Sequence, residues 1–242
     1  GRVLLMDVSR IDNMISSGDI YRDTTLLASM KHAREQGRPL HLMGLLSDGG
    51  VHSMNTHLYA LIEMAKRENV PGIFIHCFMD GRDTPPRSAN EDLKRLKEAL
   101  PTSVPVATVC GRYWVMDRDN RWERVSRAYN LMVDADAPRF ADPLDVITQS
   151  YANDKSDEFI EPAVVGDYAG MKDGDGILCF NFRADRVRDT RALQRRKLAD
   201  HAAGRRRARL LCRRIPRRQA GEDRPPARSE LCGRGQCGGP AL

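Results

Sequence analysis

The chain has 242 residues, of which 30% are charged, and its net charge of +6 is unevenly distributed. From Arg188 onward 16 basic residues accompany 5 acidic ones, so this segment carries +11 and residues 1–187 carry −5. No stretch approaches the roughly 18 to 20 apolar residues that span a bilayer, and the amino-terminal sequence lacks a signal-peptide pattern. We therefore expect a soluble, cytoplasmic protein without a membrane partner.

The composition divides the chain into two unlike parts. All fourteen Phe, Tyr and Trp residues lie at or before Phe182, and no valine follows Val187. A segment of this kind cannot bury enough apolar surface to offset the entropy lost on ordering, whereas a domain of the first part's size buries roughly 70% of its unfolded surface. We predict one domain over residues 1–187 and a disordered tail rich in Arg, Pro and Gly over residues 188–242.

Within residues 1–187, strand-like and helical patterns alternate. Helices are predicted near 8–17, 23–36, 54–65, 89–100, 122–133 and 142–152, and strands at 39–46, 72–79, 104–110, near 159–165 and at 175–182. Ser88 and Glu91 have the spacing of a capping box at the start of a helix. Three consecutive strand, loop and helix units predict an α/β fold, with a mainly parallel sheet and helices on both faces.

Charged side chains follow the predicted strands. They are Arg82, Arg112, Arg118, Arg183 and Arg186, together with Asp48, His52 and Asp83. Because the carboxyl ends of parallel strands meet at one edge of a sheet, we expect these side chains to converge on one site. Several arginines around one site suit a small, multiply charged anion, and a phosphorylated acid is the predicted ligand.

Each loop taken alone also has a simpler interpretation. SDGGVHS can be a glycine turn that Asp48 shapes, and we favour that role for Asp48. DGRDTPP can hold a local ion pair, and the charges of GRYWVMDRDNRW can lie in water. FNFRADR places Arg183 and Arg186 one helical turn apart, as a fork for phosphate or carboxylate oxygens. The occurrence of all four loops at equivalent strand ends favours the binding interpretation.

Four segments in this order, HLMGLLSDGGVHS, FMDGRDTPP, GRYWVMDRDNRW and FNFRADR, closely resemble the cofactor-independent (2,3-bisphosphoglycerate-independent) phosphoglycerate mutases. The resemblance extends from Gly1 to about Arg188. It implies an isomerase of glycolysis that interconverts 3-phosphoglycerate and 2-phosphoglycerate through a phosphoserine, with two manganese ions (Mn2+). The family's fold has a phosphotransferase domain inserted into a metal-binding domain related to alkaline phosphatases, and this chain resembles the inserted domain.

The resemblance also implies roles for single residues. The positions that match the family's substrate-binding residues are His52, Arg82, Asp83, Arg112, Arg118, Arg183 and Arg186. The arginines would hold the carboxylate and the migrating phosphate. Asp83 would orient or deprotonate the substrate hydroxyl that receives phosphate, and His52 would hydrogen-bond the phosphoglycerate.

The departures from the family pattern carry expectations of their own. The serine that becomes phosphorylated and the manganese ligands lie, in the family, outside the segments recognised here. The match ends near Arg188, and a shifted reading frame is the favoured explanation of the tail. The resemblance therefore predicts a monomeric chain that keeps the substrate clamp, lacks the nucleophile and the metal ligands, and is inactive alone.

Two other functional classes remain open at this stage. One is a nucleic-acid-binding protein that uses the basic segment 205–218 as an arm. The acidic body and the absence of aromatic residues from the tail argue against this class. The other is a different phosphate-processing enzyme related to alkaline phosphatases.

Overall fold

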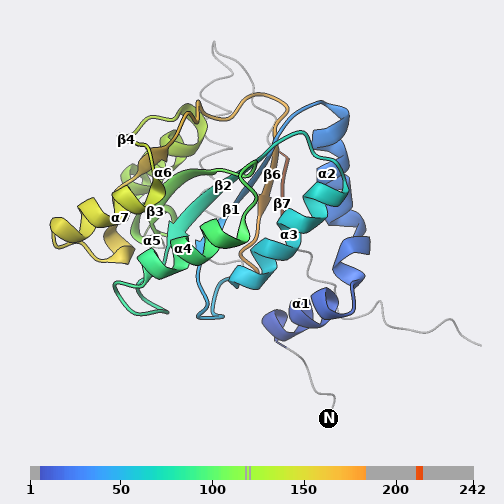
Figure 1. Ribbon diagram of the computed structural model, residues 1–242, viewed down its shortest axis with the longest axis horizontal. Coiled ribbons are helices and arrows are strands. Elements are labelled where there is room, and N and C mark those ends of the chain that lie inside the picture. Colours follow the sequence, from blue (N-terminus) through green and yellow to red (C-terminus); the bar gives the residue numbers. More distant parts are fainter. Residues whose placement is uncertain (1–5, 118, 120, 184–210, 215–242) are drawn as a thin grey trace, which may run out of the picture.

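The structure, a computed structural model, describes residues 6–117, 119 and 121–183, and the backbone of residues 211–214. It has an α/β architecture around one twisted sheet (Figure 1). The strands are β1 (Leu40–Leu46), β2 (Ile73–Met79), β3 (Val106–Gly111), β4 (Arg139–Phe140), β5 (Ala163–Val165), β6 (Gly176–Cys179) and β7 (Leu211–Arg214). Their order in the sheet is β4-β5-β3-β2-β1-β6-β7. All neighbours pair in parallel except β3 and β5, which confirms the predicted mainly parallel sheet.

Helices lie between successive strands from β1 to β5, and two more precede β1. They are α1 (Asp7–Ser16), α2 (Thr24–Glu35), α3 (Asn55–Arg67), α4 (Ala89–Ala99), α5 (Arg112–Val115), α6 (Trp122–Asp134) and α7 (Pro143–Ala152), with 3-10 turns η1 (Asp19–Arg22) and η2 (Asp157–Phe159). The longer predicted elements are all present near their expected positions. The two-residue β4 and the four-residue α5 were not predicted, because elements this short leave no periodic pattern in a sequence.

Two apolar layers enclose the sheet. On one face Leu42, Ile75 and Val109 pack with buried residues of α2, α3, α4 and α7. On the other face Leu45 and Cys110 pack with residues of α5 and α6. Both faces of the central strands are therefore covered, as their nearly continuous apolar sequences indicate.

One local prediction differs from the structure. The capping box at Ser88 does not form, since the Ser88 side chain makes no capping hydrogen bond. Asp157 caps α4 instead, because its Oδ2 atom accepts from the backbone N–H groups of Ser88 and Ala89 at 2.8 and 2.9 Å. The predicted tail lies mostly outside the described residues. Its residues Leu211–Arg214 form β7, which pairs in parallel with β6 and so hydrogen-bonds the backbone groups on that edge of β6.

A buried chain of polar side chains crosses four elements of the sheet region. The Nε2 atom of His41 lies 3.2 Å from Asp175 Oδ2, and its Nδ1 atom lies 2.9 Å from Nε2 of His76. His76 Nδ1 in turn lies 2.8 Å from the hydroxyl oxygen of Thr108. Each of these residues is at most 2% exposed, and Tyr168 makes edge contacts with both imidazole rings. These side-chain contacts link β1, β2 and β3 to one another, and β1 to the start of β6, within an otherwise apolar layer.

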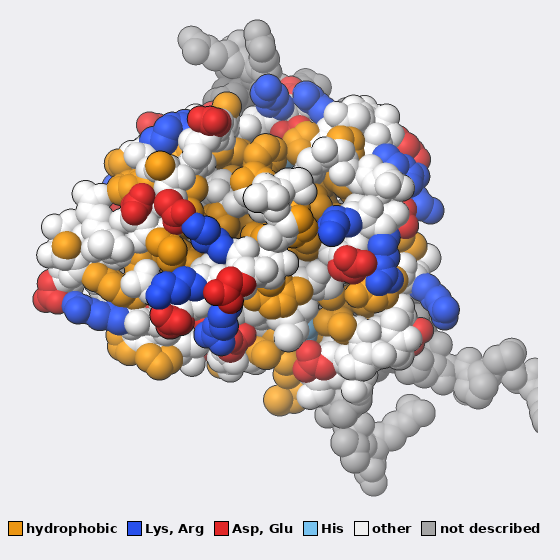
Figure 2. Space-filling view, viewed as in Figure 1, with side chains coloured by type: hydrophobic (Ala, Val, Ile, Leu, Met, Phe, Trp, Pro, Cys, Tyr) orange, Lys and Arg blue, Asp and Glu red, His pale blue; other side chains and the backbone are white. Residues whose placement is uncertain are grey.

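The surface of the described part shows basic and acidic side chains interspersed on the face seen in Figure 2. On α4, for example, Arg95 pairs with Asp92 at 2.7 Å and with Asp48 at 3.1 Å, and Lys94 pairs with Glu91. None of the helices among the described residues is both long enough and apolar enough to cross a membrane.

Candidate functional site

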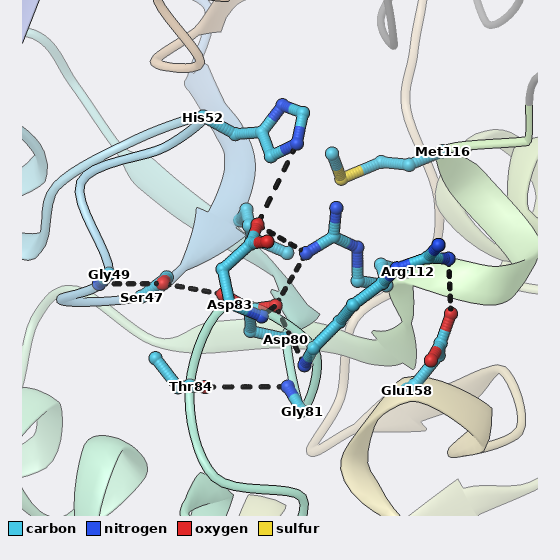
Figure 3. A network of polar contacts seen from close by, with 12 residues as sticks. Ser47, Gly49, His52, Asp80, Gly81, Asp83, Thr84, Arg112, Met116 and Glu158 are labelled. Carbon is cyan, nitrogen blue, oxygen red and sulfur yellow. Dashed lines mark hydrogen bonds and ion pairs between the residues drawn. The ribbon is translucent and has the colours of Figure 1, made fainter.

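The loops that follow β1, β2 and β3 meet around one buried carboxylate, that of Asp80 (Figure 3). Asp80 comes directly after β2 and its side chain is 1% exposed. Its Oδ2 atom accepts a hydrogen bond at 2.6 Å from the hydroxyl of Ser47, which follows β1. Its Oδ1 atom accepts at 2.5 Å from Nη1 of Arg112, the first residue after β3. Adjacent parallel strands thus bring three consecutive loops together, as the sequence predicts.

Arg112 joins Asp80 to Asp83. The Nη1 atom of Arg112 lies 2.6 Å from Asp83 Oδ2 as well as 2.5 Å from Asp80 Oδ1, and the arginine side chain is 4% exposed. His52, which is 3% exposed, places its Nε2 atom 3.7 Å from the same Asp83 oxygen. Figure 3 shows the contacts from His52 and Arg112 ending at the Asp83 carboxylate. His52 and Arg112, which follow different strands, therefore both contact the Asp83 carboxylate.

The charges in this network stabilise one another. Burial alone would raise the pKa of Asp80, but hydrogen bonds from the Asp83 backbone N–H, from Ser47 and from Arg112 outweigh it and lower the pKa below its usual value. Burial likewise works against the charge of Arg112, and the hydrogen bonds to Asp83 and Asp80 raise its pKa above the ordinary value. Both groups are therefore ionised at neutral pH, and the arginine has two carboxylate partners.

Glycines allow the loops to approach closely. A Cβ atom on Gly49 would lie 2.8 Å from the carbonyl oxygen of Asp83, which explains a glycine in SDGGVHS next to the DGRD loop. A Cβ atom on Gly111 would lie 2.1 Å from the carbonyl oxygen of Glu158. The segment around η2 therefore packs directly against the end of β3. At both positions the requirement is for space between backbones rather than for an unusual φ.

The segment after β6 reaches the same region. The backbone N–H groups of Phe182 and Arg183 both donate to the carbonyl oxygen of His52, at 2.9 and 3.4 Å. The buried Asn181 accepts a hydrogen bond at 2.9 Å from the backbone N–H of Leu45 in β1. The FNFRADR motif thus lies beside the SDGGVHS motif, and the exposed Arg183 is the last residue described before the gap.

Two predicted residues point to other partners. Arg82 adjoins Asp83, but its side chain is 55% exposed and its guanidinium pairs with Glu158 at 3.4 Å. Asp48 is 44% exposed and pairs with Arg95 of α4 rather than with the Asp80, Asp83 and Arg112 network. Arg118 and Arg186 lie outside the described residues.

Several residues of the network were missed by sequence reasoning. Asp80 and Ser47 stand directly after predicted strands, so the rule that selected Asp48 and Asp83 would also have selected them. Glu158 and Asp157 lie more than 70 positions beyond Asp80, and their sequence pattern carries no signal for this site. Among the residues that the structure describes, no group of three or more His, Cys, Asp or Glu could hold a metal ion.

The fold and the site define a class, an α/β domain with a charged site at the carboxyl ends of a mainly parallel sheet. A family model described as "BPG-independent PGAM N-terminus" matches residues 11–213. The chain belongs to this family, that of the 2,3-bisphosphoglycerate-independent phosphoglycerate mutases, and the resemblance found in the sequence is confirmed.

Individual relatives agree with this assignment. The chain is 55% identical over 189 residues to the 2,3-bisphosphoglycerate-independent phosphoglycerate mutase of Rhodopseudomonas palustris, and 47% identical over 188 residues to that of Gluconobacter oxydans. A crystal structure of Leishmania mexicana phosphoglycerate mutase at low cobalt concentration superposes with a TM-score of 0.74 at 34% identity. Each comparison covers 78% of this chain but only 37% of the relative, so the chain spans well under half of these proteins.

Proposed function

We propose that the described domain binds phosphoglycerate within a phosphoglycerate mutase, an isomerase that interconverts 3-phosphoglycerate and 2-phosphoglycerate. The observation that carries the proposal is the contact of His52, Asp83 and Arg112, which come from three separate loops of a family member. Residues 1–187 would form this substrate-binding phosphotransferase domain. In the whole protein the reaction would pass through a phosphoserine.

The geometry supports specific roles. Asp83 is 19% exposed, so its carboxylate can reach a ligand while Arg112 and His52 hold it from two sides. It would orient the acceptor hydroxyl of the substrate and take up its proton. The more exposed Arg82 and Arg183, with Arg118 and Arg186, would bind the carboxylate and the phosphate, and would stabilise the charge of the transferring group.

We propose no metal step on the residues described here, because they contain no cluster that suits Mn2+. The two ions implied by the family would be held by other parts of the whole protein. For this chain alone the proposal is therefore weak binding of phosphoglycerate without turnover, since contacts made by the remaining parts would be missing.

Calorimetric titration of the 242-residue chain with 3-phosphoglycerate tests the proposal. Arg183→Ala and Arg82→Ala should each weaken binding about tenfold, because each removes a charge-assisted hydrogen bond to the ligand. Arg22→Ala is the matched control, since Arg22 is 86% exposed in η1 and outside the network. Equal affinities for all four proteins would refute the arginine clamp. Conversion of 3- to 2-phosphoglycerate by this chain with Mn2+ would refute the absence of turnover.

A further inference from the structure

We propose that Asp80 is a positioning residue of this site, and that its carboxylate holds the loops carrying His52, Asp83 and Arg112 in one arrangement. The inference rests on the proposed function, because it adds a residue to the same phosphoglycerate site. Asp80 does not act on the ligand itself, since its side chain is 1% exposed and both of its oxygens have protein partners. It acts through the residues around it.

The first contact fixes the loop of Asp80 itself. Its Oδ1 atom accepts hydrogen bonds from the backbone N–H groups of Arg82 and Asp83, at 3.2 and 3.0 Å. An aspartate that binds the N–H groups two and three residues ahead closes a tight turn. This turn determines where Asp83 stands and in which direction its carboxylate points.

The second contact reaches the loop of His52. The Ser47 hydroxyl donates to Asp80 Oδ2, and the Ser47 hydroxyl oxygen in turn accepts from the backbone N–H of Gly49 at 3.0 Å. A hydroxyl has one proton, so its donation to Asp80 leaves its lone pairs for Gly49. Asp80 thereby fixes the direction of the Ser47 hydroxyl and, through it, the start of the turn that leads to His52.

The third contact orients Arg112. Asp80 and Asp83 share the Nη1 atom of this arginine, so Asp80 determines the position from which the guanidinium contacts Asp83. One buried carboxylate therefore makes contacts with the loops after β1, β2 and β3.

Asp80→Asn in the 242-residue chain is the informative variant. The amide has the shape of the carboxylate, but it lacks the charge and cannot accept at both positions. The matched control is Asp175→Asn, which removes the charge of a carboxylate that is also buried, at 3% exposure of its side chain, and that also accepts from a backbone N–H, that of Lys172. Asp175 precedes β6 and so lies at the opposite end of the strands from the site.

The first measurement needs no ligand. Amide hydrogen exchange of Arg82 and Asp83 should become about tenfold faster in Asp80→Asn, relative to the Cys77 amide within β2, because these two N–H groups lose a charged acceptor. In Asp175→Asn the ratio of the exchange rates of Arg82 and Asp83 to that of Cys77 should stay within about twofold of the parent value. Unchanged ratios in Asp80→Asn, or equal changes in both variants, would overturn the positioning role.

The second measurement is the affinity for 3-phosphoglycerate. Removal of a negative charge would by itself tighten the binding of an anion, whereas loss of loop positioning would weaken it. We expect Asp80→Asn to bind about tenfold more weakly and Asp175→Asn to bind as the parent does. Tighter or unchanged binding in Asp80→Asn overturns the inference. If the parent chain does not bind 3-phosphoglycerate at all, the proposed function fails, and the hydrogen-exchange result alone decides whether Asp80 orders the loops.

Discussion

Asp157 accepts a hydrogen bond from the backbone N–H of Ala89 at 2.9 Å, although 68 positions separate the two residues. This contact ties η2 to the beginning of α4, and Tyr151 of α7 donates its hydroxyl to the other oxygen of Asp157 at 2.5 Å. One carboxylate therefore links α4, α7 and the segment that packs against the end of β3. The region beside the site owes its order to a contact between distant parts of the sequence.

Replacement of this cap should be costly. We expect Asp157→Ala to lower the free energy of unfolding by about 2 kcal/mol, because two N–H groups at the start of α4 and the Tyr151 hydroxyl lose their acceptor. Asp167→Ala is the control, since the Asp167 side chain is exposed and lies outside this cap, and it should cost less than about 0.5 kcal/mol. Urea denaturation measures both values, and similar costs for the two variants would contradict the capping role.

The closest backbone approach near the site predicts a second effect. Gly111→Ala should destabilise the domain by about 3 kcal/mol or more, because the new methyl group would lie 2.1 Å from a backbone oxygen that cannot rotate away. Gly72→Ala is the matched control, since its methyl group would have its nearest neighbour at 3.5 Å, and it should cost less than about 1 kcal/mol. Thermal unfolding distinguishes the two, and an equally stable Gly111→Ala variant would disprove the close packing of Glu158.

Removal of Arg112 should leave two carboxylates without their shared cation. We expect Arg112→Met to lower the free energy of unfolding by about 3 to 5 kcal/mol, because Asp80 then remains as a buried, uncompensated charge. The second substitution Asp80→Asn should restore about 1 to 3 kcal/mol of this loss in the double variant. A double-mutant cycle in urea measures the coupling, and strictly additive costs would show that the two side chains do not interact.

The buried histidines predict how stability depends on pH. Burial and the neighbouring His41 lower the pKa of His76 well below its usual value, so this imidazole stays neutral in the folded protein. In the unfolded chain the same group gains a proton as the pH falls below about 6.5. The unfolded state then binds more protons, and the folded state loses stability at up to about 1.4 kcal/mol per pH unit below that value.

Denaturation by urea between pH 7.5 and 5.5 checks this dependence. Burial also lowers the pKa of His57, against the opposing effect of Asp12, so both histidines contribute in the same direction. His76→Gln should show a shallower loss than the parent on acidification. A parent protein whose stability does not change over this range would contradict the neutral state of His76.

The main features of the fold could be predicted from the sequence because they rest on repeated local patterns. The apolar segments of β1, β2 and β3 each precede a polar loop and an amphipathic helix, and parallel pairing then follows from their order. Asp83, His52 and Arg112 could be placed in one region for the same reason. The contacts of Asp157 and Glu158 could not, because they depend on how the chain returns after α7. The predicted capping box at Ser88 was wrong for the same reason, since the distant carboxylate of Asp157 accepts from the N–H groups at the start of α4.

The polar chain across the sheet is continuous. Asp175 contacts Nε2 of His41, Nδ1 of His41 contacts Nε2 of His76, and Nδ1 of His76 contacts the Thr108 hydroxyl. Each of these contacts needs one donor and one acceptor, so the hydrogen at one contact decides where the next must lie. A change at any one of these four positions leaves a donor facing a donor, or a buried atom without a partner. We therefore expect these four residues to be conserved together, or substituted together, among related proteins.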